Sequence, residues 1–309
     1  MKYLPVALIV TAASLRTPAG PDPAFYRPVI DAITIGSDTV WFCSSASSDV
    51  APVDFLWIRR TREWKRAAPG LAARCTPRSS RRSDDAADTG RIAPGLRLTR
   101  ILGKRDSTQT QLEPDLLELI DDVNGRRTTL TRTIDTLRVA THLDGHGELL
   151  PDTISSLIGA TTVSDTLVWI GLYGGFGEDG GTFGGVYRVD RRTGDHELFL
   201  HDGLDASQVT GIASIGGWLW VASQRPGEYG PYSGPGLLSR EHRTGEWRAY
   251  TDSTSPLPDD LIRKMASDGK ILALATAKGL AIVDVNGGPS GDAITRWDVR
   301  YFQIGRAHV

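Results

Sequence analysis

The sequence predicts an all-β fold, namely a β-propeller made of four-stranded antiparallel blades. Short apolar strand patterns recur about every 50 residues, and glycine-containing turns separate them. Trp169 and Trp220 occupy matching positions 51 residues apart, and Gly194 and Gly245 repeat the same spacing. Four short strands in each period of this length are typical of a propeller blade.

Each repeat is expected to contain the same four strands in the same order. An apolar strand is followed by a turn dipeptide and a second apolar strand. A longer loop leads to a third apolar strand, and a tight turn leads to a polar fourth strand that carries aromatic residues. In the repeat around Trp169 these segments are 157–158, 164–165, 167–170, 185–189 and 196–199. A polar fourth strand fits the outermost position of a blade.

Five blades are expected, at about residues 25–69, 95–143, 154–201, 207–252 and 259–302. They could form a complete ring or an incomplete one. The second blade diverges most, with an expected hairpin from 116–120 and 126–133 and an expected last strand at 137–141. The stretch 70–94 is rich in Arg, Ser and Asp and lacks periodicity, so it is expected to be a flexible insertion.

Both ends of the chain are expected to lie outside the propeller. Residues 1–24 contain a basic start, an apolar run too short to span a bilayer, and several prolines, which is typical of a signal peptide and linker. A first buried strand is the alternative. The segment 303–309 is expected to be a non-native tail, because Ile-Gly-Arg-Ala-His-Val translates the start of a common sequencing adapter. The natural chain would then continue past Phe302.

Composition limits the classes of partner and of metal site. The formal net charge of −2 gives no electrostatic reason for binding nucleic acid. Two cysteines exclude a disulfide-dense scaffold and a multi-cysteine zinc module. In an exported chain Cys43 and Cys75 could form one disulfide, with two separate thiols as the alternative.

Motifs for cofactors and metals are weak in this sequence. Residues 175–180 match the pattern G-x-G-x-x-G, but a strand follows them where a dinucleotide site needs a helix. His142 and His146 flank Asp144, and we interpret them as loop residues rather than metal ligands. We expect no cofactor, no metal and no catalytic residue.

The linkers that lead into three of the repeats, at 149–154, 201–209 and 255–262, share a pattern of small, polar and leucine residues before the turn and its apolar strand. With the Gly-Leu or Gly-Val start of the third strand, this pattern resembles the two-component-regulator propeller repeats of extracytoplasmic sensor regions and related secreted propellers. The resemblance covers about 150–302 well and 30–66 in part. It implies a scaffold that binds a ligand or partner, and it carries no catalytic set.

Long loops are the expected binding elements. Antiparallel strand order places the loops between second and third strands on one face, and three of them are long, at 44–54, 172–184 and 223–235. Aromatic rings can stack on sugars or peptides, while charged groups fix polar atoms. The expected ligand-binding residues are Tyr173, Phe176, Glu178, Asp179, Phe183, Arg225, Glu228, Tyr229 and Tyr232. Packing of one loop on another is the alternative for each of them.

The sequence therefore predicts a non-catalytic, secreted or periplasmic propeller, with a sensor module as one form of it. The expected partner is a carbohydrate, a peptide or a protein, and no membrane span is expected. The alternative is a propeller enzyme of the lactonase or lyase kind, with catalytic or metal-binding residues facing the channel. Innermost-strand residues such as Thr34, Gly159 and Ala213 offer no such groups.

Overall fold

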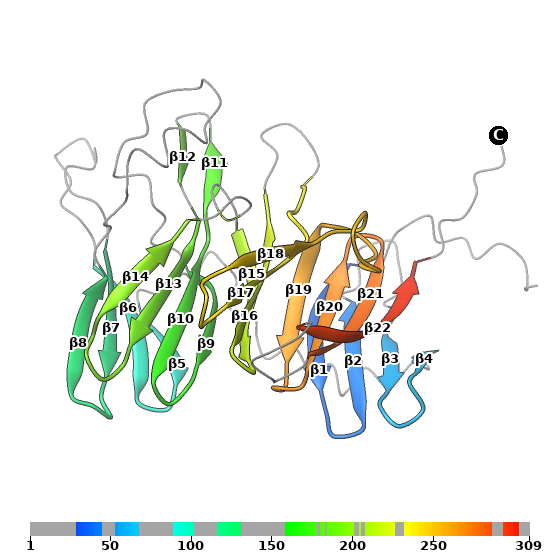
Figure 1. Cartoon of the computed structure of the whole chain (residues 1–309), viewed down its shortest axis with the longest axis horizontal. Coiled ribbons are helices and arrows are strands. Elements are labelled where there is room, and N and C mark those ends of the chain that lie inside the picture. The colour runs from blue at the N-terminus through cyan, green and yellow to red at the C-terminus, as the bar shows by residue number, and fades with distance from the viewer. Residues whose placement is uncertain are drawn as a thin grey trace, which may run out of the picture.

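The structure of the chain is a computed structural model that describes most of the five repeats (Figure 1). The expected signal peptide and linker at 1–24, the strand expected at 137–141 and the tail at 303–309 lie outside the described residues. The described residues are 29–44, 53–67, 89–101, 116–130, 158–177, 180–182, 184–200, 204, 208–225, 232–285 and 293–302.

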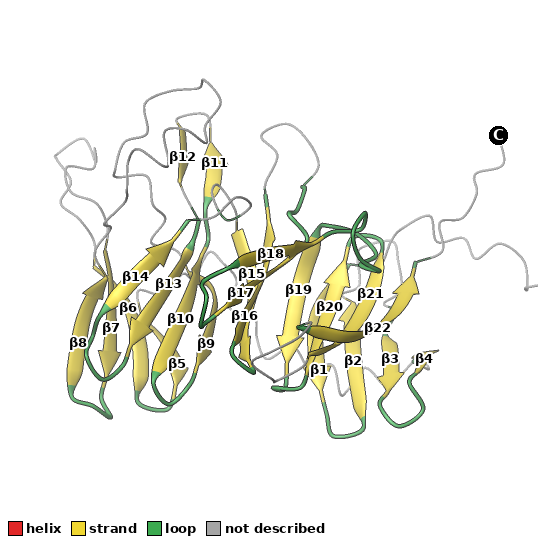
Figure 2. Cartoon of the chain, in the orientation of Figure 1, coloured by secondary structure: helices red, strands yellow, loops and turns green. Residues whose placement is uncertain are grey.

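Five four-stranded antiparallel sheets form the fold, which confirms the prediction of an all-β propeller with about five blades. Figure 2 shows strands and loops but no helix in the described part of the chain. We number the sheets as blades 1 to 5 in chain order. Blade 1 contains β1 (Ile30–Ile35), β2 (Thr39–Ser44), β3 (Phe55–Ile58) and β4 (Glu63–Arg66); blade 2 contains β5 (Thr89–Ala93), β6 (Leu96–Ile101), β7 (Leu116–Asp121) and β8 (Arg126–Leu130); blade 3 contains β9 (Ile158–Val163), β10 (Leu167–Leu172), β13 (Val186–Asp190) and β14 (His196–Phe199); blade 4 contains β15 (Gln208–Ile215), β16 (Trp218–Gln224), β17 (Leu237–Glu241) and β18 (Trp247–Tyr250); blade 5 contains β19 (Ile262–Ser267), β20 (Ile271–Thr276), β21 (Gly279–Val285) and β22 (Ile294–Tyr301).

The turns follow from local sequence, as blade 4 illustrates. Ile215 pairs with Trp218 across a two-residue turn made of Gly216 and Gly217. Both glycines have positive φ, at 57° and 86°. Two-residue hairpins of type I′ require this backbone at both central positions, and glycine adopts it without a steric penalty.

Blade 2 differs from the expectation at its first strand. β5 lies inside the stretch 70–94, so the interpretation of that whole stretch as a flexible insertion is wrong for residues 89–93. The strand has little apolar alternation, because Ile92 is its only large apolar residue. The turn Pro94-Gly95 and the pairing with β6 define it instead. The hairpin of β7 and β8 agrees with the expected one.

The blades are arranged in an arc in the order 2, 3, 4, 5, 1 (Figure 1). Four apolar clusters fill the contacts between blades 2 and 3, 3 and 4, 4 and 5, and 5 and 1. The innermost strands follow the same order, because β5 lies against β9, β9 against β15, β15 against β19, and β19 against β1. The first blade therefore packs against the last one, and the ring is open between blades 1 and 2.

The open junction coincides with a polar face of blade 2. In every other blade the second strand presents buried apolar side chains to the preceding blade of the arc, such as Ile170 in blade 3 and Val221 in blade 4. In blade 2, Leu96 and Leu98 pack against blade 3. Because side chains alternate along a strand, Arg97 and Thr99 point the other way, towards the open junction.

A β-bulge recurs at the start of the innermost strand in four blades. The pairing with the second strand skips Asp31, Gly159, Thr210 and Arg263, one in each of blades 1, 3, 4 and 5. A bulge leaves the skipped residue outside the regular ladder. In blade 4 the hydroxyl of Thr210 donates a 2.9 Å hydrogen bond to the carbonyl of Ile262 in blade 5. In blade 4 the bulge thus gives two neighbouring inner strands a polar contact.

Candidate functional site

The candidate site lies on the face where second strands lead into third strands. In blade 3 this connection contains a small hairpin, β11 (Gly175–Gly177) and β12 (Gly180–Thr182), which projects beyond β10 and β13 in Figure 1. The short turns between third and fourth strands lie at the opposite edge, as Figure 2 shows. The predicted binding residues that the structure describes on this face therefore come from the loops of blades 3 and 4.

Tyr173 and Tyr232 come from neighbouring blades and approach each other on this face. The backbone of Tyr173 forms an isolated bridge with Gln208, the first residue of the innermost strand of blade 4. Burial raises the pKa of Tyr173, and repulsion from the phenol of Tyr232 raises it further. Tyr232 itself is 49% exposed. Tyr173 is thus the half-buried tyrosine of this face, and Tyr232 is the accessible one.

A pair of amide side chains lies beneath the loops of blade 4. Gln224 donates a 2.7 Å hydrogen bond from Nε2 to Oε1 of Gln208. Gln208 is only 5% exposed, although it begins an innermost strand. The pair joins the first and second strands of the blade where the long loop begins. Neither glutamine belongs to a sequence motif, so neither was predicted as a site residue. Their matching positions in a paired hairpin were the signal that the sequence offered.

The loop of blade 4 is held at its base by a backbone ladder. Arg225 and Ser233 form an isolated bridge, with N–O distances of 2.7 Å and 3.1 Å. Arg225 is exposed, and it begins the same blade 4 loop that carries Tyr232. The base of the blade 1 loop is closed in another way, because Ser44 bonds to both Val53 and Asp54.

Three of the nine predicted binding residues are described with their side chains, and they lie on one face: Tyr173, Arg225 and Tyr232. Phe176 lies on β11, where only the backbone is described. The other five lie outside the described residues: Glu178, Asp179, Phe183, Glu228 and Tyr229. Tyr173 and Tyr232 interact electrostatically, and the roles of all nine residues stay predictions.

Cys43 is buried on β2 and is disulfide-bonded. Cys75, the other cysteine of the sequence, lies outside the described residues. The pairing of the two stays a prediction.

The innermost strands carry charged residues beside the three uncharged residues predicted to face the channel. Thr34 and Gly159 are exposed and Ala213 is buried, and none of them is ionisable. β19 also contains Arg263 and the exposed Lys264. Among the described residues, no group of three or more His, Cys, Asp or Glu side chains could hold a metal ion. A search of the same residues finds no helix with the length and hydropathy of a membrane span.

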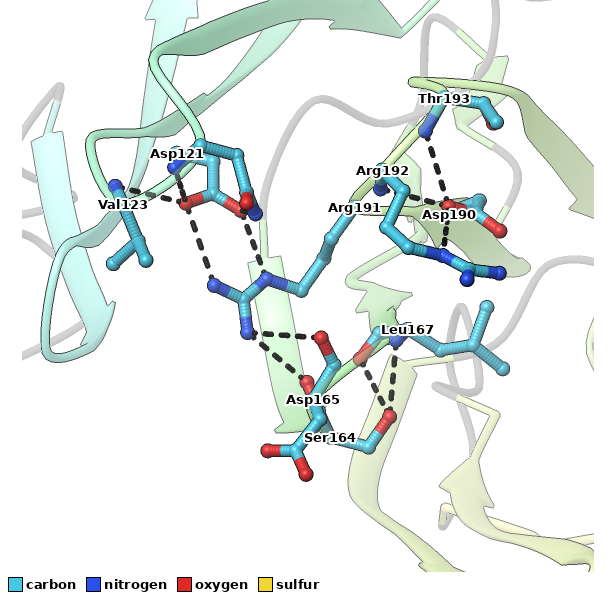
Figure 3. A network of polar contacts seen from close by, with 10 residues as sticks. Asp121, Val123, Ser164, Asp165, Leu167, Asp190, Arg191, Arg192 and Thr193 are labelled. Carbon is cyan, nitrogen blue, oxygen red and sulfur yellow. Dashed lines mark hydrogen bonds and ion pairs between the residues drawn. The ribbon is translucent and has the colours of Figure 1, made fainter.

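A polar network on the short-turn face connects blades 2 and 3 (Figure 3). Arg191 binds Asp121 through two contacts, Nε to Oδ2 at 2.8 Å and Nη2 to Oδ1 at 3.3 Å. Nη1 of the same guanidinium donates to the carbonyl of Ser164 at 3.2 Å. Burial alone would raise the pKa of Asp121, but the hydrogen bonds from Arg191 and Asn124 outweigh it and lower the pKa to about 2. This contact fixes the two blades below the loop face.

Comparison with known proteins supplies no family for the chain. No protein-family model matches it, and no curated protein matches it. Among solved structures, the extracellular domain of BT4673 from B. thetaiotaomicron is 14% identical, with a TM-score of 0.36 over 85% of this chain. The GH74 xyloglucanase from Xanthomonas campestris is 13% identical, with a TM-score of 0.33 over 87% of this chain. The chain spans 28% of the BT4673 domain and 46% of the xyloglucanase.

Proposed function

We propose that the chain is a non-catalytic, exported propeller that binds a carbohydrate, a peptide or a protein partner through the loop face of blades 3 and 4. A sensor module in the periplasm or at the cell exterior is the form we favour. The proposal rests on the fold class, on the resemblance of the repeats to regulator propellers, and on the residues that meet on this face.

The observation that carries the proposal is that Tyr173 and Tyr232, from two different blades, lie on one face and interact electrostatically. Tyr173 is half-buried, while Tyr232 is 49% exposed. Tyrosine rings offer stacking area at a low cost in side-chain entropy. Arg225 adds an exposed guanidinium on the same loop, which can fix a hydroxyl, carbonyl or carboxylate of a ligand.

The neighbouring amides support the same interpretation. Gln208 and Gln224 hold the start of the blade 4 loop through a 2.7 Å hydrogen bond, so the loop begins from a rigid base. Binding sites on loops gain affinity when the surrounding scaffold orders the contact residues in advance. We therefore assign Gln208 and Gln224 a positioning role.

The test is a glycan array and a peptide array probed with the full chain, followed by calorimetry on any ligand found. Replacing Tyr173 or Tyr232 by alanine should weaken binding by about 10-fold or more, as expected for an aromatic anchor. Tyr301→Ala is the matched control, because Tyr301 is 61% exposed on the outer strand of blade 5. Binding that both loop variants retain would contradict the proposed face. Ester or lactone hydrolysis by the chain, without ligand binding, would contradict the non-catalytic role.

A further inference from the structure

One backbone contact recurs at the end of the third strand in several blades. The amide of Arg59 in blade 1 donates to Asp38, that of Arg191 in blade 3 donates to Thr166, and that of His242 in blade 4 donates to Gly217. The acceptor is always the last residue of the turn between the blade's first two strands, immediately before the second strand begins. These three side chains therefore start from equivalent places, beside the preceding blade of the arc.

Two of the three side chains bind an acid of the preceding blade. Arg191 forms the bidentate pair with Asp121 of blade 2. Arg59 pairs with Asp268 of blade 5. A guanidinium is suited to this position because it stays charged at any physiological pH and matches a carboxylate in two contacts.

Blade 4 has a histidine at this position, and its neighbour is an aromatic ring. The imidazole of His242 stacks on Trp169 of blade 3, with ring centroids 5.3 Å apart and an interplanar angle of 14°. Its Nε2 lies 3.0 Å from the hydroxyl of Ser214. Its Nδ1 is buried and has no hydrogen-bond partner among the described residues. The neutral imidazole uses Nε2 to bond Ser214, whereas the protonated ring would place a charged, unpaired N–H at the buried Nδ1.

The charged groups around His242 also favour the neutral ring. Burial lowers its pKa, and Arg240 on the preceding strand β17 and Arg188 on β13 lower it further. Glu197 on β14 lies 3.8 Å from Arg188 and is paired with it. Glu241, the last residue of β17, is bound by Thr244 and Arg243. A cation over an indole ring is favourable at an exposed site, but here burial and two guanidiniums oppose the charge.

We propose that the contact between blades 3 and 4 is a proton-sensitive joint, in which protonation of His242 loosens blade 4 from blade 3. The equivalent contacts at Asp121 and Asp268 each pair a guanidinium with a carboxylate. These groups keep their charges near the pH at which a histidine titrates, so these contacts should not change there. The joint does not depend on ligand binding, so it can be tested without a ligand.

The experiment measures urea unfolding of the full chain at about pH 7.5 and about pH 5.5, on either side of the ordinary histidine pKa of about 6.5. The wild type should lose stability at the lower pH, because His242 binds a proton more readily in the unfolded chain than in the folded chain. His242→Gln cannot be protonated and should lose less than half as much. His196→Gln, on the outer strand of blade 3, is the matched control and should behave as the wild type. An equal loss in His242→Gln and wild type would overturn the proposal.

A second measurement needs no variant. The C–H resonances of the wild-type histidines give their pKa values by NMR, and hydrogen exchange reports local opening. After correction for intrinsic rates, exchange along β16 at the 3–4 joint should rise severalfold at the lower pH, while exchange along β2 at the 5–1 joint should stay constant. If no buried histidine titrates below about 6.5, or if both joints open equally, the proposal is wrong.

Discussion

Arg191 of blade 3 and Asp121 of blade 2 form the most buried ion pair between two blades in the described part of the chain, with side chains 11% and 3% exposed. Asp121 also accepts backbone hydrogen bonds from Val123 and Asn124, each at 3.1 Å (Figure 3). One carboxylate thus closes its own turn and binds the next blade. Its charge is therefore needed for both contacts.

Replacing Arg191 by methionine should lower the free energy of unfolding by about 3 kcal/mol, because it leaves a buried carboxylate without its cation. Urea unfolding at neutral pH measures the loss. Arg192→Met is the matched control, since Arg192 is the next residue and its side chain is 73% exposed. A loss of the same size in both variants would show that the turn, rather than the ion pair, is responsible.

Acid should remove the same contact in the wild type. The pKa of Asp121 is about 2, below its ordinary value of 3.8. A depressed acid pKa contributes stability above about pH 4 that is lost as the pH falls towards about 2, and the shift corresponds to about 2 kcal/mol. Comparison of Asp121→Asn with the wild type over this range isolates the contribution. A variant that loses stability on acidification as steeply as the wild type would contradict it.

Gly159→Ala should destabilise the contact between the inner strands of blades 3 and 4 by about 1–3 kcal/mol. A Cβ atom there would lie 2.1 Å from the carbonyl oxygen of Val209, which belongs to a backbone that cannot easily move. Gly90→Ala is the matched control on the innermost strand of blade 2, where nothing lies within 4 Å of an added Cβ. Thermal unfolding of the two variants checks the prediction, and equal midpoints would refute the close approach.

The polar face of blade 2 should be accessible at the open junction. A cysteine in place of Arg97, whose side chain is 44% exposed, should react rapidly with a maleimide reagent. A cysteine in place of Val168, the matching position in blade 3, should react slowly because Val168 is 0% exposed. Protection of both positions would mean that the ring closes between blades 1 and 2 in solution.

Disruption of the disulfide at Cys43 should destabilise blade 1. If Cys75 is the partner, the bridge closes a loop of about 30 residues, for which the chain-entropy relation gives about 3–4 kcal/mol. Cys43→Ser and Cys75→Ser should then lose similar stability in non-reducing buffer. Peptide mapping without reductant identifies the bridge directly, and a mass that matches two free thiols would contradict the pairing.

Much of the fold follows from local patterns along the chain. The spacing between Trp169 and Trp220 and the turn glycines Gly216 and Gly217 predict strands, hairpins and their four-stranded grouping. These signals are local because strand alternation and turn backbone depend on neighbouring residues. The first strand of blade 2 was not predicted, because its pairing with β6, rather than its own apolar pattern, defines it.

The candidate site could be predicted only in part. Loop length and aromatic content indicated Tyr173 and Tyr232, since both features are visible in the sequence. The amide pair of Gln208 and Gln224 was not visible, because the two residues meet only across a paired hairpin.

The sequence by itself determined the repeat, the strand order and the face that carries the long loops. Tertiary structure alone decided that blade 1 packs against blade 5, that the ring is open beside the polar face of blade 2, and that His242 stacks on Trp169. The physical reason is that these contacts join residues far apart in the chain, and their energies depend on burial and on charged neighbours that no local pattern specifies.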